Sequence, residues 1–403
     1  MIQNPAAPDG GLGAWTQVAV GCLAVFLTWG YANAFGAFQS YYISVLPQNQ
    51  SAISWIGSLQ AWLTFSTGAI SGWLLDAGYL TVALVAGAVL QLLGIFLMSV
   101  STQFWQLVLT QGILSGLGNG LIFTPTLALV LTYFSSRRSL ALGIVTLGNS
   151  LGGVIYPAIV RGLLAHFGFS WMARTIGFIH LAGFCLVVGF LRARLQPQRK
   201  GPVMDIAAFR NRVYVAYVFG LFFFCWARYY TFYYVGSFGI QVLHISYTEA
   251  TYLIMIINGT GIPARIIVGL LADRFGPFNT SIPTGLCLTA VAFSWLRISN
   301  RVGIFAWTAF YGLFSAGIQS LIPSGVASIS ERMDIIGARL GMCFTVMSFA
   351  ALSGPPIGGA IQNAASGSYG AAQVWAGLAD ASCVLLIILA RVLQGRRKLE
   401  EKA

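Results

Sequence analysis

Arg265 lies deep inside an apolar run and is the residue of this chain best suited to bind an anion. It precedes Asp273 by eight residues, which corresponds to roughly 12 Å of helical rise. One helical turn away on either side stand Gly261 and Gly269, so its own helix offers no acidic partner. A charge at the centre of a membrane helix costs about 2.5–3.5 kcal/mol on insertion scales. Arg265 therefore requires a carboxylate, either from a bound solute or from another segment.

Three further ionisable side chains interrupt apolar runs, and each has two interpretations. Arg228 lies among the tyrosines of segment 229–234, where it can make cation–π contacts or extend toward the membrane surface. Asp380 can carry a coupling proton or act as the counter-ion of Arg228 or Arg265. His180 can titrate near neutral pH or serve as a hydrogen-bonded packing residue. We predict Arg228 as a substrate-binding residue, and Asp380 and His180 as coupling candidates.

Neutral polar residues in other apolar runs complete the predicted substrate site. Each of them can line a central cavity or join two helices by a hydrogen bond. Together with Arg265 and Arg228, the predicted substrate-binding set comprises Asn33, Asn149, Tyr156, Asn258 and Gln319.

The composition shows what kind of element must position these residues. The chain has 403 residues, of which 57% are hydrophobic and 8% charged, and its mean hydropathy is +0.78. A soluble domain carries about 25% charged residues, so this composition excludes a soluble enzyme. A membrane-spanning helix needs about 20 apolar residues. We expect an all-α membrane protein with roughly twelve spans, which begin near Trp15, Ala52, Leu80, Trp105, Leu140, Trp171, Val213, Thr248, Thr280, Gly303, Leu340 and Ala371.

A basic polar stretch divides these spans into two sets of six. The predicted organisation is an N-terminal half at 1–191, a tether at 192–212 and a C-terminal half at 213–403. If the tether and both termini are cytoplasmic, sixteen of the 22 Lys and Arg residues lie on that side, as the positive-inside rule requires. Topology thus explains the net charge of +12, and we expect no nucleic-acid partner.

The two halves share an internal repeat. Gly72 and Asp76 recur as Gly269 and Asp273, both at an offset of 197 residues. A small residue lets two helices approach closely, and the carboxylate can face a helix N-terminus or an arginine. Such a contact can latch the cytoplasmic side shut. The predicted gating residues are Asp76, Asp273, Arg274, Arg137 and Arg138.

These repeats resemble the major facilitator superfamily, whose loops after spans 2 and 8 carry G-x-L-a-D-R-x-G-R. The second copy, 269–276 (GLLADRFG), follows the pattern, whereas the first has Ala77 at the arginine position. The resemblance implies two six-helix halves that rock about a site at the midplane.

Longer stretches are similar to the monocarboxylate porter branch, particularly its fungal members. They are 8–15 (PDGGLGAW), 133–143 (YFSSRRSLALG), the span 8 pattern around Asn258 and Arg265, and 352–359 (LSGPPIGG). In that branch the span 8 arginine binds the substrate carboxylate. The proton-coupled animal members carry a lysine where this chain has Asn33 and an aspartate where it has Gly261. Their proton relay is therefore absent in its known form.

We therefore predict a secondary active transporter of a small organic, anionic or carboxylate-bearing metabolite, with fungal efflux of a secondary metabolite as the leading function. Uptake of a monocarboxylate or vitamin-like nutrient is the alternative, and a transporter-like nutrient sensor is the alternative from another class. The sequence has no G-x-x-x-x-G-K-[ST] loop for ATP, and no enzyme activity, cofactor or metal is predicted. The expected partners are the solute, the lipid bilayer and a co-transported proton. We expect a multi-pass monomer in the plasma membrane, with the vacuolar membrane as the other location.

Overall fold

A computed structural model describes residues 7–48, 50–195, 205–330 and 332–400, and within these ranges every regular element is a helix. The first group comprises α1 (Gly11–Val25), α2 (Tyr31–Asn33), α3 (Phe35–Val45), α4 (Gln50–Ser66), α5 (Gly68–Asp76), α6 (Leu80–Met98), α7 (Phe104–Leu107), α8 (Ser115–Tyr133) and α9 (Arg138–Phe190). The second comprises α10 (Arg212–Leu243), α11 (Tyr247–Phe275), α12 (Pro277–Ser294), α13 (Arg301–Ile329), α14 (Ile336–Ala364) and α15 (Gly370–Glu400). The predicted all-α fold class is confirmed.

The helix boundaries agree with twelve spans. Nine segments of the described chain are long and apolar enough to cross a membrane. One of them, α9, has 53 residues, which as a single rod would measure about 80 Å. It is broken at Gly168, where φ is 71° and ψ is 174°, and so supplies two spans. The α4–α5 pair and α12, with 18 residues, supply the remaining two.

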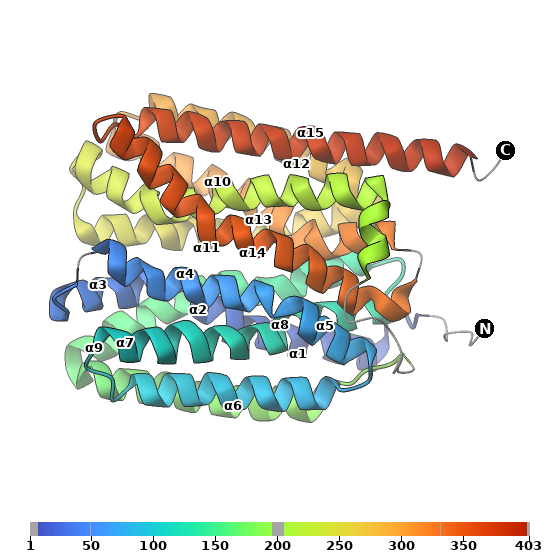
Figure 1. Ribbon diagram of the computed structural model, residues 1–403, viewed down its shortest axis with the longest axis horizontal. Coiled ribbons are helices and arrows are strands. Elements are labelled where there is room, and N and C mark those ends of the chain that lie inside the picture. The colour runs from blue at the N-terminus through green and yellow to red at the C-terminus, as the bar shows by residue number, and fades with distance from the viewer. Residues whose placement is uncertain (1–6, 49, 196–204, 331, 401–403) are drawn as a thin grey trace. The chain divides into compact units, whose positions relative to one another are not determined.

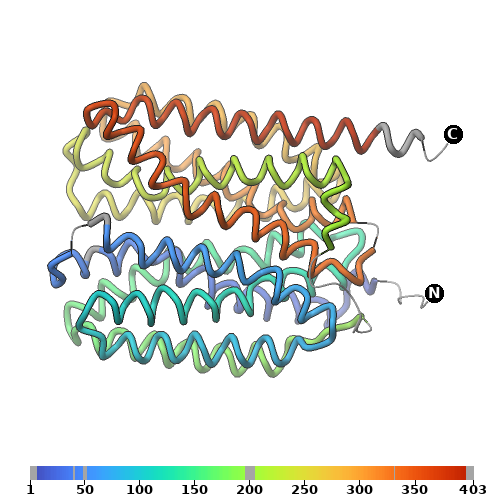
Figure 2. Tube along the Cα trace, viewed as in Figure 1, coloured from blue at the N-terminus to red at the C-terminus, as the bar shows by residue number. Residues whose placement is uncertain are grey.

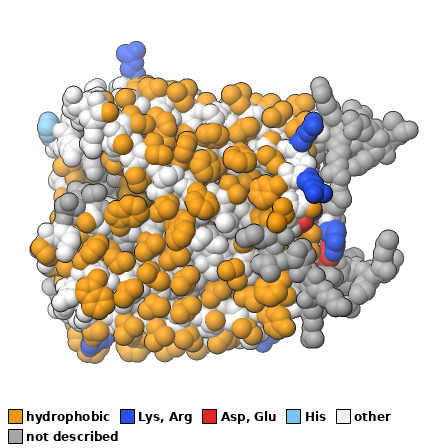
Figure 3. Space-filling model, viewed as in Figure 1, with side chains coloured by type: hydrophobic (Ala, Val, Ile, Leu, Met, Phe, Trp, Pro, Cys, Tyr) orange, Lys and Arg blue, Asp and Glu red, His pale blue; other side chains and the backbone are white. Residues whose placement is uncertain are grey.

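The surface of the helices is suited to lipid. Hydrophobic side chains cover most of the face seen in Figure 3, whereas Lys and Arg side chains lie near its edges. Phe178 on α9 and Leu385 on α15 are 57% and 66% exposed. Large apolar side chains at such positions are stable in a bilayer, because hydrocarbon replaces the missing protein neighbours.

The described chain forms two compact units. The first unit comprises the chain up to Asp205 together with Arg332–Ser348, which includes the start of α14. The second unit comprises the other residues from Ile206 onward. Within the first unit α6 packs along α8 and α9 (Figure 1), and within the second α10 packs along α15. The predicted division at 1–191, 192–212 and 213–403 stays a prediction, and positions 196–204 of the tether lie outside the described residues.

Glycines allow α1 and α9 to approach each other closely. A Cβ at Gly148 would lie 2.1 Å from the Cys22 carbonyl oxygen, and one at Gly152 would lie 2.3 Å from the Cα of Gly30. Gly30 ends a π-helical stretch, Phe26–Gly30, that continues α1. Any larger residue at these two positions of α9 would push the π-helical stretch away.

A second glycine crossing joins α5 to the first part of α14, which is a continuous helix in Figure 2. A Cβ at Gly72 would lie 2.0 Å from the Gly337 carbonyl oxygen, and a Cβ at Gly341 would lie 2.2 Å from that of Gly68. The glycines stand four residues apart on both helices, which is the spacing of closely packed membrane helices. Backbone thus meets backbone without intervening side chains.

Replacing Gly72 by alanine tests this crossing. The new methyl group must displace backbone rather than a flexible side chain, and overpacking of this kind costs about 1–3 kcal/mol. We expect Gly72→Ala to lower the apparent midpoint of thermal unfolding in detergent. The matched control is Gly162→Ala on α9, where a Cβ would meet nothing within 4 Å. Equal midpoints for the two variants would contradict the close crossing.

Candidate functional site

Arg265 is buried in the second unit and is held by a residue that was predicted separately. It is 1% exposed, and its Nη2 donates a hydrogen bond of 2.6 Å to Oε1 of Gln319 on α13. The helices α11 and α13 pack along each other over much of their length, which brings the two side chains together. The amide oxygen of Gln319 thus accepts one hydrogen bond from the buried guanidinium. The role of this pair in substrate binding stays a prediction.

Arg228 forms a second buried cationic centre, on α10. It is 6% exposed, its Nη1 donates to Oγ of Ser315 at 3.0 Å, and its guanidinium lies 4.5 Å from the ring centre of Phe232. The sequence-based expectation placed it among tyrosines, yet its cation–π partner is a phenylalanine one turn further along α10. Asp380 on α15 lies within electrostatic range of Arg228. Ser315 and Phe232 were missed because neither is distinctive in an apolar sequence.

Two of the predicted polar residues meet in the first unit. The side-chain amide of Asn33 donates a hydrogen bond to Oδ1 of Asn149, and this joins α2 to α9. Asn258 behaves differently, since its side-chain amide donates to the Ile254 carbonyl of its own helix at 3.0 Å. The structure therefore pairs Asn33 with Asn149, whereas the side-chain amide of Asn258 donates to the backbone of its own helix.

His180 and Tyr156 also come together, beside the π-helical stretch. His180 is fully buried, with Nδ1 at 2.8 Å from the Ile176 carbonyl oxygen, Nε2 at 2.9 Å from that of Leu27, and Nε2 at 3.4 Å from the Tyr156 hydroxyl. The Leu27 carbonyl also accepts from Nε2 of Gln91 at 2.7 Å. These contacts make His180 a hydrogen-bonded link between helices, and its coupling role stays a prediction. Gln91 was missed because nothing in sequence signals a π-helical stretch.

Asp76 caps the start of α14. Its Oδ1 accepts a hydrogen bond from the Gly337 amide at 3.1 Å, and its Oδ2 accepts one from the Ala338 amide at 2.7 Å. A carboxylate at a helix N-terminus is stabilised by the unpaired amides and by the helix dipole. The side chain acts without the arginine that Ala77 replaces. Asp76 follows Gly68 and Gly72 at the same four-residue spacing and so lies on the same face of α5. Because the two glycines pack against α14, the Asp76 side chain also lies next to α14.

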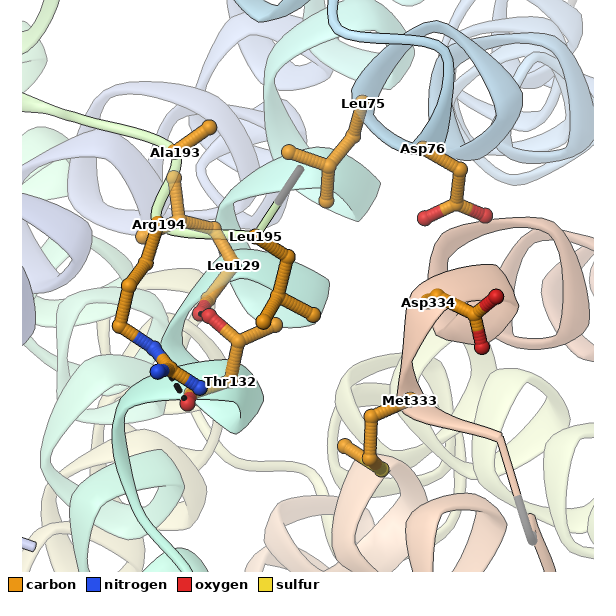
Figure 4. Close-up of a pocket in the computed structure, with 9 residues that line it drawn as sticks. All are labelled: Leu75, Asp76, Leu129, Thr132, Ala193, Arg194, Leu195, Met333 and Asp334. Carbon is orange, nitrogen blue, oxygen red and sulfur yellow. Dashed lines mark hydrogen bonds between the residues drawn. The ribbon is translucent and has the colours of Figure 1, made fainter. Parts of the chain in front are cut away.

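A small pocket lies beside this cap, as Figure 4 shows. Asp76 and Asp334 stand on one side of it, and Arg194 stands on the other. Arg194 donates from Nε to the Thr132 carbonyl at 3.1 Å, and Asp334 pairs with Arg332 at 2.5 Å. The charged side chains around the pocket are thus held in place by contacts of their own.

The other predicted gating residues lie at helix ends. Arg137 is exposed, and Arg138 donates from Nε to the Phe134 carbonyl at 2.6 Å. Arg274 is exposed with its guanidinium 5.3 Å from the ring centre of Phe275, and Asp273 is half-buried. These positions suit residues that contact the ends of neighbouring helices.

Asp9 connects the chain before α1 to the turn between α8 and α9. It accepts hydrogen bonds from the amide and hydroxyl of Ser135 and, at 2.9 Å, from the Ser136 amide. Burial tends to raise the pKa of Asp9, but these hydrogen bonds outweigh burial and lower it. Two stretches that the sequence analysis compared with the same family, 8–15 and 133–143, are therefore in direct contact.

In the described part of the chain no three His, Cys, Asp or Glu side chains come together as metal ligands would. The polar groups instead form pairs within each unit. The described part of the second unit contains the two buried guanidinium groups of Arg265 and Arg228, and a guanidinium is chemically suited to bind a carboxylate or another anion.

Comparison with known proteins identifies the family. A model of the Major Facilitator Superfamily matches residues 16–355. The chain belongs to the Major Facilitator Superfamily. It is 41% identical to an MFS-type transporter of Gibberella zeae over 92% of this chain and 84% of that one. It is 39% identical to the aspyridones efflux protein of Emericella nidulans over 88% of this chain and 73% of that one. The monocarboxylate porter branch stays a prediction.

Solved structures share the fold of this transporter at low identity. The superfamily transporter FucP in the outward conformation has a TM-score of 0.75 and 15% identity, over 94% of this chain and 99% of that one. The human organic anion transporter MFSD10 has a TM-score of 0.74 and 14% identity, over 93% and 99%. Members of this family are membrane transporters and not enzymes, and the chain is a multi-pass membrane protein.

Replacing Asp76 by asparagine tests the cap on α14. Hydrogen bonds to a charged group contribute about 1.5–3 kcal/mol, and an amide side chain keeps one acceptor but loses the charge. We expect amide hydrogen exchange at the start of α14, positions 336–341, to become about tenfold faster, which corresponds to about 1.4 kcal/mol. The control is Asp273→Asn, the matching position of the repeat. Unchanged exchange in Asp76→Asn would contradict the cap.

The Asp9 contact predicts a pH dependence. Since the folded pKa is lowered, the contact stabilises the fold above the unfolded value of about 3.9 and is lost as the pH falls through the folded value. We expect the apparent unfolding midpoint of the wild type to exceed that of Asp9→Asn at pH 7. This difference should shrink as the pH falls below about 4 and disappear below the folded pKa of Asp9. A difference that stays constant down to pH 3 would show that another interaction is responsible.

Proposed function

We propose that this transporter exports a small anionic or carboxylate-bearing secondary metabolite of a fungus by secondary active, alternating-access transport. The support for export is that one of its relatives is named as an aspyridones efflux protein. Other relatives are MFS-type transporters of fungi such as Aspergillus niger, which supports transport in a fungus. The observation that supports an anionic solute is the burial of a guanidinium group in the second unit, where Arg265 is 1% exposed.

Arg265 and Gln319 form the proposed anion-binding pair. A guanidinium that keeps its charge in a low-dielectric site binds a carboxylate strongly, because little solvent competes for it. Arg228 and Asn258 belong to the proposed site within the second unit, and Asn33, Asn149 and Tyr156 of the first unit are also proposed as substrate-binding residues. We further propose that Asp76, Asp273, Arg274, Arg137 and Arg138 act in gating, for which the cap by Asp76 on α14 is the support.

The remaining assignments form part of the same proposal. They are two six-helix halves joined by the tether at 192–212, a monomer in the plasma membrane, and cytoplasmic termini. Sixteen of the 22 Lys and Arg residues lie on the side that this topology makes cytoplasmic.

Uptake of a monocarboxylate is the second candidate. The branch resemblance of segment 133–143 supports it, whereas Asn33 and Gly261 replace the two charged residues of the proton-coupled members. The two candidates differ in the size of the solute and in the direction of net movement. They can therefore be separated by one vesicle experiment.

The experiment measures uptake of aspyridone and of lactate into inside-out plasma-membrane vesicles that contain the transporter. We expect accumulation of aspyridone and not of lactate. Arg265→Ala should reduce the initial rate at least tenfold, because it removes an interaction of about 1.5–3 kcal/mol with a charged partner. Arg265→Lys should restore part of the rate, since it keeps the charge but not the planar geometry.

Arg297→Ala is the matched control, because Arg297 is an exposed arginine of the same unit. It should leave the rate unchanged at equal expression. Full transport by Arg265→Ala would remove the anion-binding assignment. Transport of lactate in preference to aspyridone would favour the monocarboxylate alternative.

A further inference from the structure

Asp380 is buried in the second unit without hydrogen-bond partners. It is 2% exposed, and neither Oδ1 nor Oδ2 receives a hydrogen bond from any described residue. It lies on α15, which packs against α10 and α12. An ionised carboxylate in such a place has lost its water and gained no donor in exchange. Its neutral, protonated form is far less costly to bury.

Arg228 is a cation within electrostatic range of Asp380, yet the two do not form an ion pair among the described residues. The guanidinium instead donates to Ser315 on α13 and lies over Phe232. Both side chains are almost completely buried, at 2% and 6% exposure. Asp380 and Arg228 are therefore within electrostatic range of each other without forming an ion pair. The guanidinium contacts Ser315 and Phe232 instead, and the carboxyl group has no hydrogen-bond partner among the described residues.

The other titratable groups around Asp380 are neutral hydroxyls and thiols. Tyr311 on α13 and Cys383 on α15 lie within its electrostatic range, and Cys225 on α10 lies within that of Cys383. α12 contains no Asp, Glu, Lys, Arg or His between Pro277 and Ser294. The short helix Trp295–Arg297 also packs against α15 and carries Arg297, which is exposed. Among the described residues, Arg228 is therefore the buried cation within electrostatic range of Asp380.

We propose that Asp380 is a proton-binding site with Arg228 as its alternating counter-ion. In the conformation described here Asp380 carries the proton. When its O–H bond breaks, the proton leaves to water and the electron pair stays on the carboxylate. The guanidinium, protonated throughout, then moves from Ser315 and Phe232 to the carboxylate. This exchange changes the contacts between α10, α13 and α15.

The site binds a proton whatever the solute is. Its use as the coupling site of transport rests on the proposed function. Proton binding at Asp380 and its coupling to transport are therefore tested by two separate measurements.

The first measurement is infrared difference spectroscopy of the full-length protein in lipid nanodiscs, titrated from acid to alkaline pH without solute. Ordinary carboxyl groups are protonated in acid and ionise near pH 4, so the informative signal is the carbonyl band of a protonated carboxylic acid that persists above that pH. We expect this band to disappear on further alkalinisation in the wild type and to lose intensity in Asp380→Asn. Asp334→Asn is the control, since that carboxylate is already paired with Arg332, and it should keep the band. Asp380→Glu should keep the band at a shifted frequency, which tests the site even if Asp380→Asn does not fold.

Arg228→Gln tests the counter-ion. Removing the cation deprives the carboxylate of its partner, so the band should persist to higher pH than in the wild type. An unchanged titration in this variant would overturn the role of Arg228. A band of wild-type intensity in Asp380→Asn would overturn the proton site itself.

The second measurement is aspyridone movement in proteoliposomes with and without a pH gradient. We expect the gradient to accelerate the wild type and to have no effect on Asp380→Asn, which should still exchange aspyridone. If the infrared band behaves as expected and no aspyridone moves, the proposed function fails while the proton site stands. If Asp380→Asn responds to the gradient like the wild type, the coupling role of the site is wrong.

Discussion

Hydrocarbon offers no hydrogen-bond partner, so each polar group that these helices carry into the membrane must be satisfied by another group of the protein. The contacts inside both units follow from this constraint. The Leu27 carbonyl in the π-helical stretch is met by Gln91 and His180, and the buried guanidinium of Arg265 is met by Gln319. Polar residues that are scattered along the sequence therefore come together in pairs.

The pairs require helices that approach closely at defined positions. Gly148 and Gly152 bring α9 against the π-helical stretch, and Gly72 brings α5 against Gly337 of α14. A π-helical turn inserts one residue and changes the direction of the side chains that follow it. Close backbone contact and the local change of helix geometry together decide which polar groups can reach each other.

The buried ionisable side chains differ in the kind of hydrogen-bond partner they have. Arg265 and Arg228 donate hydrogen bonds to the neutral oxygens of Gln319 and Ser315. Asp76 accepts hydrogen bonds from the amides that begin α14. The carboxyl oxygens of Asp380 have no hydrogen-bond partner among the residues that the structure describes. A membrane protein keeps such costly groups where charge must be recognised or moved, which connects the packing of this chain to transport.

The sequence by itself determined the class of protein, the positions of the spans and the identity of the buried charges. These depend on the length and apolarity of continuous segments, and both can be read along one dimension. The break of α9 at Gly168 agrees with separate spans predicted to begin near Leu140 and Trp171. Family motifs also pointed to Arg265 and Asp76 as residues with more than a packing role.

Only the tertiary structure decided which residues meet. Gln319 was predicted either to line a cavity or to join two helices by a hydrogen bond, and its partner proved to be Arg265, 54 positions away. Asp76 accepts hydrogen bonds from amides 261 and 262 positions away. Arg228 engages Ser315 and Phe232 although Asp380 is within range. Such choices depend on the rotation and register of neighbouring helices. Nearly uniform apolar segments leave no periodic pattern from which rotation and register could be predicted.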